Sequence, residues 1–363
     1  MSARTGVVLL NFGEPENPEP AEVVPFLERI FRLNANLEGA PSPEAAHARA
    51  RQLAELRAPG LVDEYRDIGG SPMNSQSRAQ GEAVRQSLAR RGLDVRVYCA
   101  FQFTAPLPDE IVERARADGV ARLIALPVYP LCGPSTTIAA LAALRHALER
   151  AEWNPEVQEI SGWHPHPDYV RLRAEGIVET ARVAGVSLSD PRVALVFSAH
   201  GTPLKYLREG SRYDRYVEQS CAAVAAAAGC DDHVIGYQNH TNRPLEWTQP
   251  DIQTVIAGID ADHVVVVPIS FMHEQSETLA ELDHELRGEA ETRGLGFHRV
   301  RVPHDDPRFA GILADLCEPF VRREAAARRQ VPSDPVQVPN TEMPFRACLC
   351  RGVPGALCLN GRP

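Results

Sequence analysis

One histidine and a row of glutamates have the residue types and the spacing to handle metal ions and protons. His200 follows the apolar run 193–199. A neutral imidazole binds divalent transition metals, and it accepts protons near neutral pH. Glu277, Glu281 and Glu285 recur every four residues. On a regular α-helix this places three carboxylates along one face, about 6 Å apart from turn to turn, which suits the transfer of protons or of a hydrated metal ion.

Each of these groups also has an ordinary structural explanation. A single histidine at a strand end is most often a hydrogen-bonded core residue, and a row of glutamates is most often a solvated acidic face. The residue types alone leave both interpretations open for His200 and for Glu285. Carboxylates crowded together raise the pKa of at least one member, which would favour a proton relay over a purely structural role.

The stretches around these groups predict parallel strands that open into one cleft. The runs 193–199 and 264–271 are short, apolar and rich in β-branched residues, and each stops abruptly in polar residues. This pattern is typical of a parallel strand that is buried on both faces. In open α/β sheets, ligands bind in the crevice at the carboxyl ends of the strands. We therefore expect His200 and Glu277 on opposite sides of such a crevice.

Strand-like runs alternate with helical patterns along the whole chain. The expected strands are 6–11, 94–103, 122–130, 157–163, 193–200, 232–240, 264–271 and 296–302. The expected helices are 23–31, 42–58, 75–91, 107–119, 135–151, 167–183, 213–228, 252–259 and 307–329. Such regular alternation predicts the α/β class, with a parallel sheet flanked by helices in each half.

An internal repeat supports two similar halves. Four residues of the first half recur in the second at a constant offset of 141, with Pro127, Ser135, Thr137 and Leu141 matched by Pro268, Ser276, Thr278 and Leu282. The expected domains are an N-terminal lobe at 1–160, a C-terminal lobe at 161–329, and a Pro-rich linker with a Cys-bearing tail at 330–363. Several prolines after residue 330 exclude a continuous helix there.

Length and composition exclude several classes of protein. The 363 residues are 44% hydrophobic, which is enough for a sizeable core. A net charge of −10 argues against a general nucleic-acid binder, which needs a basic face. No run approaches the roughly 18 apolar residues of a spanning helix, and the N-terminus has no secretory signal pattern. We therefore expect a cytoplasmic protein, and its state as monomer or homodimer is open.

Five segments of the chain together form a recognisable pattern. They are 9–15 (Leu-Leu-Asn-Phe-Gly-Glu-Pro), 65–72, 197–203 (Phe-Ser-Ala-His-Gly-Thr-Pro), 243–247 and 277–283 (Glu-Thr-Leu-Ala-Glu-Leu-Asp). In this combination the chain resembles the ferrochelatases, lyases that insert ferrous iron into a porphyrin in haem biosynthesis. The resemblance covers nearly the whole body. It implies two Rossmann-like lobes with the porphyrin held between them.

The resemblance also implies roles for individual residues. His200 becomes a metal ligand and proton acceptor, Glu277 its partner carboxylate, and Glu281 a further metal ligand. The porphyrin-binding lips are 9–15 and 65–74, and the residues expected to contact the macrocycle are Asn11, Phe12, Tyr65, Ser71 and Met73. Protoporphyrin IX and coproporphyrin III are both plausible substrates, with Fe²⁺ as the metal.

The chain departs from the family pattern at three positions near the expected site. Gln275 stands where a second histidine is common, two residues before Glu277, and His273 could replace it. Gln102 and Phe103 stand where an arginine and a tyrosine are common. These departures motivate a second hypothesis, a porphyrin- or haem-binding carrier or regulator of the same fold without turnover. A cobalt chelatase acting on a corrinoid precursor is a third.

Three of the eight cysteines crowd the C-terminus. Cys348, Cys350 and Cys358 provide thiols on a segment with little else to bury. Some ferrochelatases carry a [2Fe–2S] cluster on three tail cysteines and one from the body, and such a cluster takes four thiolates. Cys132, three residues before the Ser135 turn, is the expected fourth ligand. A labile zinc site or free thiols are the alternatives.

Overall fold

The computed structural model describes residues 4–33, 42–230, 232–239, 245–328 and 357–359. Its strands are β1 (Arg4–Asn11), β2 (Arg96–Phe101), β3 (Val120–Pro127), β4 (Glu156–Ser161), β5 (Val193–His200), β6 (Val234–Gln238), β7 (His263–Pro268), β8 (Gly296–Arg299) and β9 (Leu357–Cys358). The helices of the first half are α1 (Pro20–Leu33), α2 (Pro43–Asp67), α3 (Met73–Arg90), α4 (Pro108–Ala117) and α5 (Ala139–Arg150). Those of the second half are α6 (Pro167–Ala184), α7 (Leu204–Arg208), α8 (Tyr213–Ala227), α9 (Ile252–Gly258), α10 (Ser276–Leu279), α11 (Arg287–Thr292) and α12 (Pro307–Arg328). Two π-helical segments complete them, η2 (Pro134–Ile138) and η3 (Glu281–Leu286).

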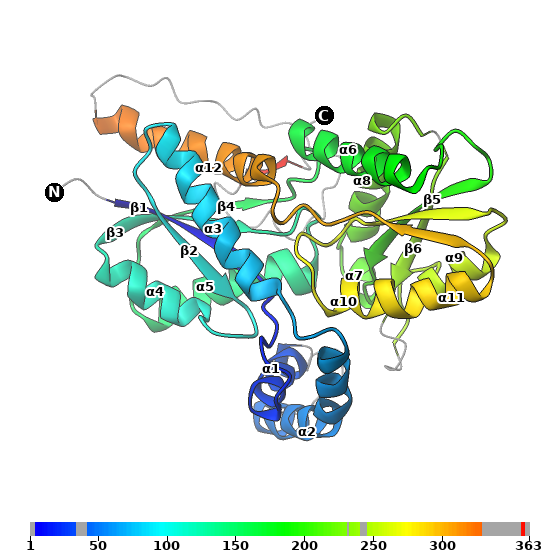
Figure 1. The fold of residues 1–363 in the computed structure, drawn as a ribbon. Helices are drawn as coiled ribbons and strands as arrows, with labels where there is room; N and C mark the ends of the chain where they lie inside the picture. The colour runs from blue at the N-terminus through cyan, green and yellow to red at the C-terminus, as the bar shows by residue number, and fades with distance from the viewer. Residues whose placement is uncertain (1–3, 34–41, 231, 240–244, 329–356, 360–363) are drawn as a thin grey trace.

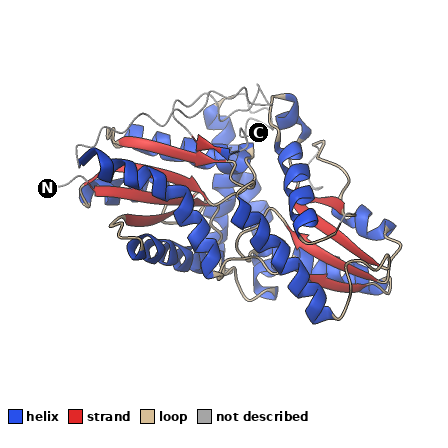
Figure 2. Ribbon diagram, turned by 90° about the horizontal axis from the view of Figure 1, so that it is seen from above, coloured by secondary structure: helices blue, strands red, loops and turns tan. Residues whose placement is uncertain are grey.

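Two parallel sheets with the same strand order form the body. One sheet has the order β2-β1-β3-β4-β9 and the other β6-β5-β7-β8. Every pairing between the named strands is parallel. Helices flank both sheets (Figure 2), so the central strands are buried on both faces, and residues 264–267 of β7 are completely buried. The predicted α/β class with helix-flanked parallel sheets is therefore confirmed.

The repeat found in the sequence coincides with equivalent places in the two sheets. Pro127 ends β3 and Pro268 ends β7, and these strands hold the same position in their sheets. A π-helical segment follows each of them, η2 after β3 and η3 after β7. Segments of this kind are rare, and they occur often at functional sites.

Helices α1 and α2 form a pair that stands apart from both sheets (Figure 1). Their contact is apolar, with Val23 and Phe26 of α1 packed in one cluster with Ala54 and Val62 of α2. Tyr65, in the last turn of α2, belongs to the same cluster and is almost completely buried. The pair therefore forms a separate helical unit, which follows the carboxyl end of β1 and leads into α3.

Helix α12 ends the second half, but it packs on the first. It lies along α3 (Figure 1), and Arg91 after α3 pairs with Asp315 at 2.5 Å and with Glu318 at 2.6 Å. Arg122 of β3 donates to the carbonyl of Phe320 at 2.6 Å. The expected lobe boundaries at residues 160 and 329 remain a prediction, with α12 as a connection between the two halves.

Among the described residues, the expected tail contributes one short strand. The short strand β9 extends the first sheet, with Ser161 opposite Cys358. The expected linker at 330–339, and with it Cys348 and Cys350, lies outside the described residues. Among the described helices, none has the length and apolar character needed to cross a bilayer. The cytoplasmic location stays a prediction.

Candidate active site

A cavity of about 1230 Å³ opens where the carboxyl ends of strands from both sheets meet. Residues that end β1, β3, β5 and β7, or follow directly after them, line it, among them Asn11, Val128, His200 and Ser270. The α1–α2 pair forms a further wall. Parallel strands place their carboxyl ends at the same edge of a sheet, and this is the edge where α/β proteins bind ligands.

His200 and Glu277 both lie in this cavity, but they are in direct contact and not on opposite sides of it as expected. The Nε2 atom of His200 lies 3.0 Å from Oε1 of Glu277, and both residues line the cavity. The Nδ1 atom of His200 lies 2.6 Å from the carbonyl oxygen of Gly201, which can only accept, so Nδ1 carries a proton and Nε2 faces the carboxylate. Burial alone would lower the pKa of His200, but the charge and hydrogen bond of Glu277 raise it above the ordinary value.

The strand end that carries His200 is fixed by two hydroxyl groups. The backbone N–H of His200 donates to Oγ of Ser270 at 3.0 Å, and the Tyr213 hydroxyl donates to the His200 carbonyl at 3.0 Å. Ser270 follows β7, so this contact ties β5 to the neighbouring strand. The imidazole, about one-third exposed (32%), therefore projects into the cavity from a rigid backbone.

Glu277 is oriented by amide groups. It lies in the first turn of α10, and the Gln275 side-chain amide donates to its Oε2 atom. The Gln238 amide donates to the Glu277 carbonyl and to Oε2 of Glu281, both at 2.9 Å. The position where the family pattern commonly has a second histidine thus holds a donor that fixes Glu277. Gln238, at the end of β6, was not predicted from the sequence.

The row of three glutamates does not follow a regular α-helix. The chain changes from α10 to the π-helix η3 at Glu281, and a π-helix has a wider turn than an α-helix. Glu277 and Glu281 line the cavity, whereas Glu285 is exposed and is not among the lining residues. Burial, followed by the charge of Glu277, raises the pKa of Glu281 to about 8.

A buried ionic group anchors the segment that carries Glu277. Arg299 of β8 donates to Asp283 at 2.8 and 2.6 Å and to Glu274 at 3.1 Å. The other oxygen of Glu274 accepts from the Thr278 hydroxyl at 2.7 Å. Arg299 is only 9% exposed, so its charge is compensated by these carboxylates. The group ties both ends of the Glu277 segment to the second sheet.

Four of the five residues predicted to contact the macrocycle line the cavity, namely Asn11, Phe12, Tyr65 and Met73. Ser71 is buried behind them. Phe12 also forms an aromatic triad with Phe26 and Phe103, whose ring centroids are 4.6–6.3 Å apart with edge-to-face geometry. Phe103, where the family commonly has a tyrosine, thus contributes to an apolar wall.

The residues at the other departures have partners within the wall. Gln102 accepts a hydrogen bond from the Tyr129 hydroxyl at 2.8 Å. His273 lines the cavity, but its Nε2 atom lies 3.3 Å from the Ser77 hydroxyl of α3. Burial, followed by the charge of His304, lowers the pKa of His273 to about 3. His273 is therefore neutral and its Nε2 atom faces α3 rather than Glu277.

Two of the four predicted cluster ligands lie among the described residues. Cys132 is buried after β3, and Cys358 in β9 packs against the same apolar cluster. Cys132 is a free thiol. Cys348 and Cys350 lie outside the described residues.

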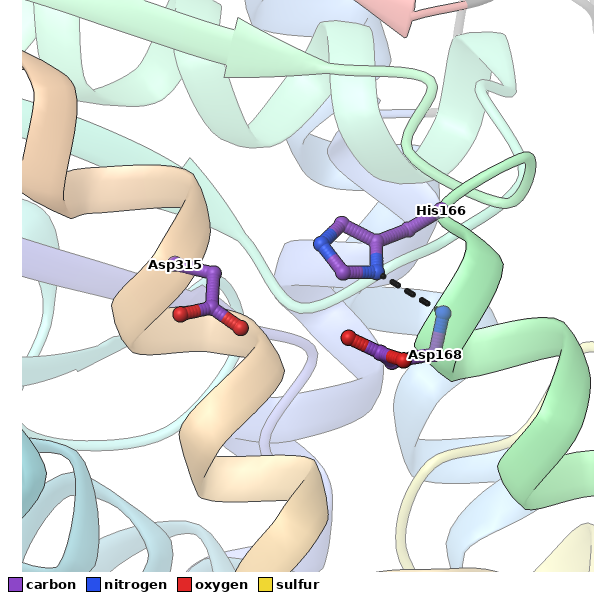
Figure 3. Close-up of side chains that lie close together, drawn as sticks. All are labelled: His166, Asp168 and Asp315. Atoms are coloured by element: carbon purple, nitrogen blue, oxygen red, sulfur yellow. Dashed lines mark hydrogen bonds between the residues drawn. The ribbon is translucent and has the colours of Figure 1, made fainter.

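Within the described part of the chain, one group away from the cavity has a spacing that would suit a metal ion. His166, Asp168 and Asp315 offer ligand atoms that all lie within 4.8 Å of one another (Figure 3). His166 Nδ1 accepts from the backbone N–H of Asp168 at 3.3 Å. The carboxylates pair with Arg171 at 2.6 Å and with Arg91 at 2.5 Å. Because arginines already compensate both carboxylates, we assign no metal to this group.

Comparisons with known proteins agree with the residue pattern. The family model described as "Ferrochelatase" matches residues 4–320. A protein named "Ferrochelatase" from Synechococcus sp. (strain JA-3-3Ab) is 34% identical over 338 residues, which are 90% of this chain and 96% of that protein. Its namesake from Gloeobacter violaceus is 32% identical over 325 residues, which are 86% and 97% of the two chains. Among solved structures, SirB from Bacillus subtilis with Fe3+ is similar, with a TM-score of 0.46 and 11% identity over 90% of this chain and 98% of that chain. On the family match and the identity to these relatives, the chain belongs to the ferrochelatase family.

Proposed function

We propose that this family member, an iron-inserting lyase, carries out metal insertion in the cavity at the strand ends, with His200 and Glu277 as the reacting pair. The observation that carries the proposal is the 3.0 Å contact between His200 Nε2 and Glu277 Oε1 in a cavity of about 1230 Å³. A catalytic base must lie within hydrogen-bond reach of the proton that it accepts. Both residues lie on the cavity surface, which supports such reach to a porphyrin bound there.

The geometry supports two tasks for His200. In its neutral form, Nε2 presents a lone pair toward the cavity, because Nδ1 donates to Gly201. That lone pair can ligate the incoming ferrous ion or accept a pyrrole proton from the porphyrin. Glu277 stabilises the imidazolium after proton transfer, and it supplies a carboxylate oxygen to the metal while the ion exchanges its water ligands.

Glu281 continues the acidic path behind Glu277. With a pKa of about 8, caused by burial and by the charge of Glu277, its carboxyl group holds a proton at neutral pH. A carboxyl group that exchanges a proton near neutrality can pass protons from the cavity toward the exposed Glu285. Glu281 also lines the cavity, where its carboxyl group can serve as a further metal ligand.

The walls of the cavity match an amphipathic macrocycle with acidic substituents. Phe12, Tyr65 and Met73 offer apolar surface, and aromatic rings pack well against a flat π-system. Arg49 and Arg57 of α2 also line the cavity and offer cationic partners for porphyrin carboxylates. Protoporphyrin IX and coproporphyrin III both fit this description.

Steady-state kinetics under anaerobic conditions test the proposal. Fe²⁺ with protoporphyrin IX or coproporphyrin III should give metalloporphyrin over many turnovers, and His200→Ala should lower kcat by about 10²–10⁴-fold, the range for losing a general acid–base group. A carrier or regulator would bind porphyrin without turnover. A cobalt chelatase would act only on Co²⁺ and a corrinoid precursor. Either result, or full activity of His200→Ala, would contradict the proposal.

We propose further that Cys132, Cys348, Cys350 and Cys358 hold a [2Fe–2S] cluster, which would tie the tail to the body. Cys358 packs against the apolar cluster that contains Cys132, which supports a shared site. Beside Cys358 in the sheet, the Ser161 hydroxyl is buried and, among the described residues, has no hydrogen-bond partner. A free hydroxyl donor beside a ligand fits the surroundings of a cluster sulfur.

Analysis of anaerobically purified protein tests the cluster. Iron and acid-labile sulfide should be present in equal amounts, with visible absorption that disappears in Cys132→Ser and in Cys358→Ser. Colourless parent protein without iron would contradict the cluster. Bound zinc in its place would support the alternative metal site.

A further inference from the structure

Glu14 is a buried carboxylate that joins the two halves of the protein. It follows β1 and is only 3% exposed. Its Oε2 atom accepts hydrogen bonds from the Ser71 hydroxyl at 2.5 Å and from the backbone N–H of Ser276 at 3.1 Å. Its Oε1 atom accepts from the Ser276 hydroxyl at 2.6 Å. Ser71 belongs to the first half of the chain, whereas Ser276 begins α10 in the second half.

The loop that carries Glu14 is itself fixed. The backbone N–H of Glu14 donates to Asn74 Oδ1 at 3.1 Å, and Asn74 Nδ2 donates back to the Glu14 carbonyl at 2.8 Å. Gly13 precedes it with φ +83°, and a Cβ atom there would lie 2.4 Å from the Thr104 hydroxyl. Only glycine accepts this conformation without strain. The carboxylate therefore reaches Ser276 from a rigid base.

Ser276 is the residue directly before Glu277. Two hydrogen bonds that Ser276 donates to Glu14 fix its backbone and its side chain, and so they fix the first turn of α10 in position and rotation. The Glu277 side chain projects from this same turn, and its Oε1 atom lies 3.0 Å from His200 Nε2. A catalytic group that is misplaced by about 1 Å can lose on the order of 10²-fold in rate.

We propose that Glu14 is a positioning residue for metal insertion, which acts from the first half of the chain through Ser276 to hold Glu277 against His200. The inference rests on the proposed role of that pair. Both Glu14 carboxylate oxygens are already engaged by Ser71 and Ser276. Glu14 also lines the cavity, but with both oxygens engaged it acts on the reaction through Ser276 and Glu277.

Two substitutions separate the hydrogen-bonding role of Glu14 from the role of its charge. Burial raises the pKa of Glu14, partly offset by the hydrogen bonds of Ser276 and Ser71. A glutamine at this position keeps one oxygen to accept from Ser71 and from the Ser276 N–H, so it preserves the contact without the charge. Methionine keeps the length and removes every acceptor.

The test compares Glu14→Met, Glu14→Gln and Ser276→Ala with the matched control Glu16→Met, an exposed glutamate of the same loop. Glu14→Met should lower kcat for iron insertion about 10–100-fold, the range for groups that orient a metal ligand. The porphyrin KM should stay within about threefold of the parent value, because the apolar contacts expected from Phe12 and Met73 are not altered. Glu14→Gln should recover most of kcat, and Glu16→Met should match the parent.

Two further readouts separate positioning from loss of stability. The visible absorption of bound Co²⁺, used as a probe metal, should change in Glu14→Met, because its ligands are displaced. Glu14→Met combined with Ser276→Ala should be no slower than Glu14→Met alone, since both act through one contact. A variant that is only less stable would melt earlier but would keep the parent kcat per folded molecule and the parent Co²⁺ spectrum.

Several results would overturn the inference. They are an unchanged kcat in Glu14→Met, a change confined to KM, multiplied losses in the double variant, or a Glu14→Gln as slow as Glu14→Met. If Glu14→Met does not fold, a parent-like kcat in Ser276→Ala overturns it, and a lowered kcat with unchanged KM supports it. An inactive parent, or a fully active His200→Ala, would instead refute the proposed function.

Discussion

Replacing Glu281 by glutamine should stabilise the protein, and the gain should grow with pH. The carboxyl group has an ordinary pKa of 4.5 and a pKa of about 8 in the folded chain, because of burial and the charge of Glu277. Between these values the folded state binds a proton that the unfolded state has released. Stability of the parent therefore falls as pH rises from about 4.5 to 8. Glutamine does not titrate, so Glu281→Gln escapes this loss.

The size of the effect follows from the two pKa values. They differ by about 3.5, and at about 1.36 kcal/mol for each pKa unit the upper limit is about 4.8 kcal/mol. Glu281 is partly exposed to solvent, which screens its charge, so we expect about 2 kcal/mol at pH 8. For a unit of 150–250 residues this corresponds to a rise in Tm of roughly 4–8 °C. Glutamine also keeps an oxygen to accept the hydrogen bond from Gln238.

Thermal and urea denaturation at several values between pH 5 and pH 8.5 measure this effect. Glu285→Gln is the matched control, because Glu285 lies in the same π-helix and is exposed. We expect the difference between Glu281→Gln and the parent to be small at pH 5 and largest above pH 8. A difference that does not change with pH, a less stable variant at pH 8, or the same slope in Glu285→Gln would refute the reasoning.

Three further predictions concern stability and are measured by denaturation at pH 7. Arg299→Met should destabilise the protein by about 2–4 kcal/mol, because it leaves buried carboxylates without their partner. The control Arg301→Met, at a side chain that is 73% exposed, should change the stability by less than about 0.5 kcal/mol. Equal effects of the two substitutions would contradict the role of the buried group. Gly288→Ala should stabilise α11 by about 0.5–1 kcal/mol, since its Cβ meets open space. Gly81→Ala should destabilise the protein by about 1–3 kcal/mol, because the new Cβ would lie 2.5 Å from Cys99 Sγ. If the same loss of stability persists in a Cys99→Ala background, this contact is not the cause.

The sequence predicted the sheets well because buried parallel strands carry a strong local signal. The apolar run of β7 and its abrupt end predicted both the strand and the edge where the cavity opens. The repeat around Pro127 and Pro268 predicted two equivalent halves, and both sheets have the same strand order. The π-helical turn at Glu281 escaped prediction, because its spacing of charged residues is the same as that of an α-helix.

The contacts between the halves could not be predicted from local pattern. Glu14 was noticed only as part of the segment 9–15, and nothing near it in sequence indicates a bond to Ser276, 262 residues away. Gln238 and Arg299 were missed for the same reason, since each acts on the Glu277 segment from another strand. The strand β9 was not predicted either, because it forms by pairing with β4 and a segment of two residues carries no local pattern that indicates a strand.

A double-mutant cycle on His200 and Glu277 tests the central claim most directly, with kcat/KM for anaerobic iron insertion as the measured quantity. If the two side chains act as one unit, His200→Ala and Glu277→Gln each lower kcat/KM by about 10²-fold or more, and the double variant is no slower than the slower single variant. Losses that multiply in the double variant, or a single variant that keeps the parent value, would contradict a shared site.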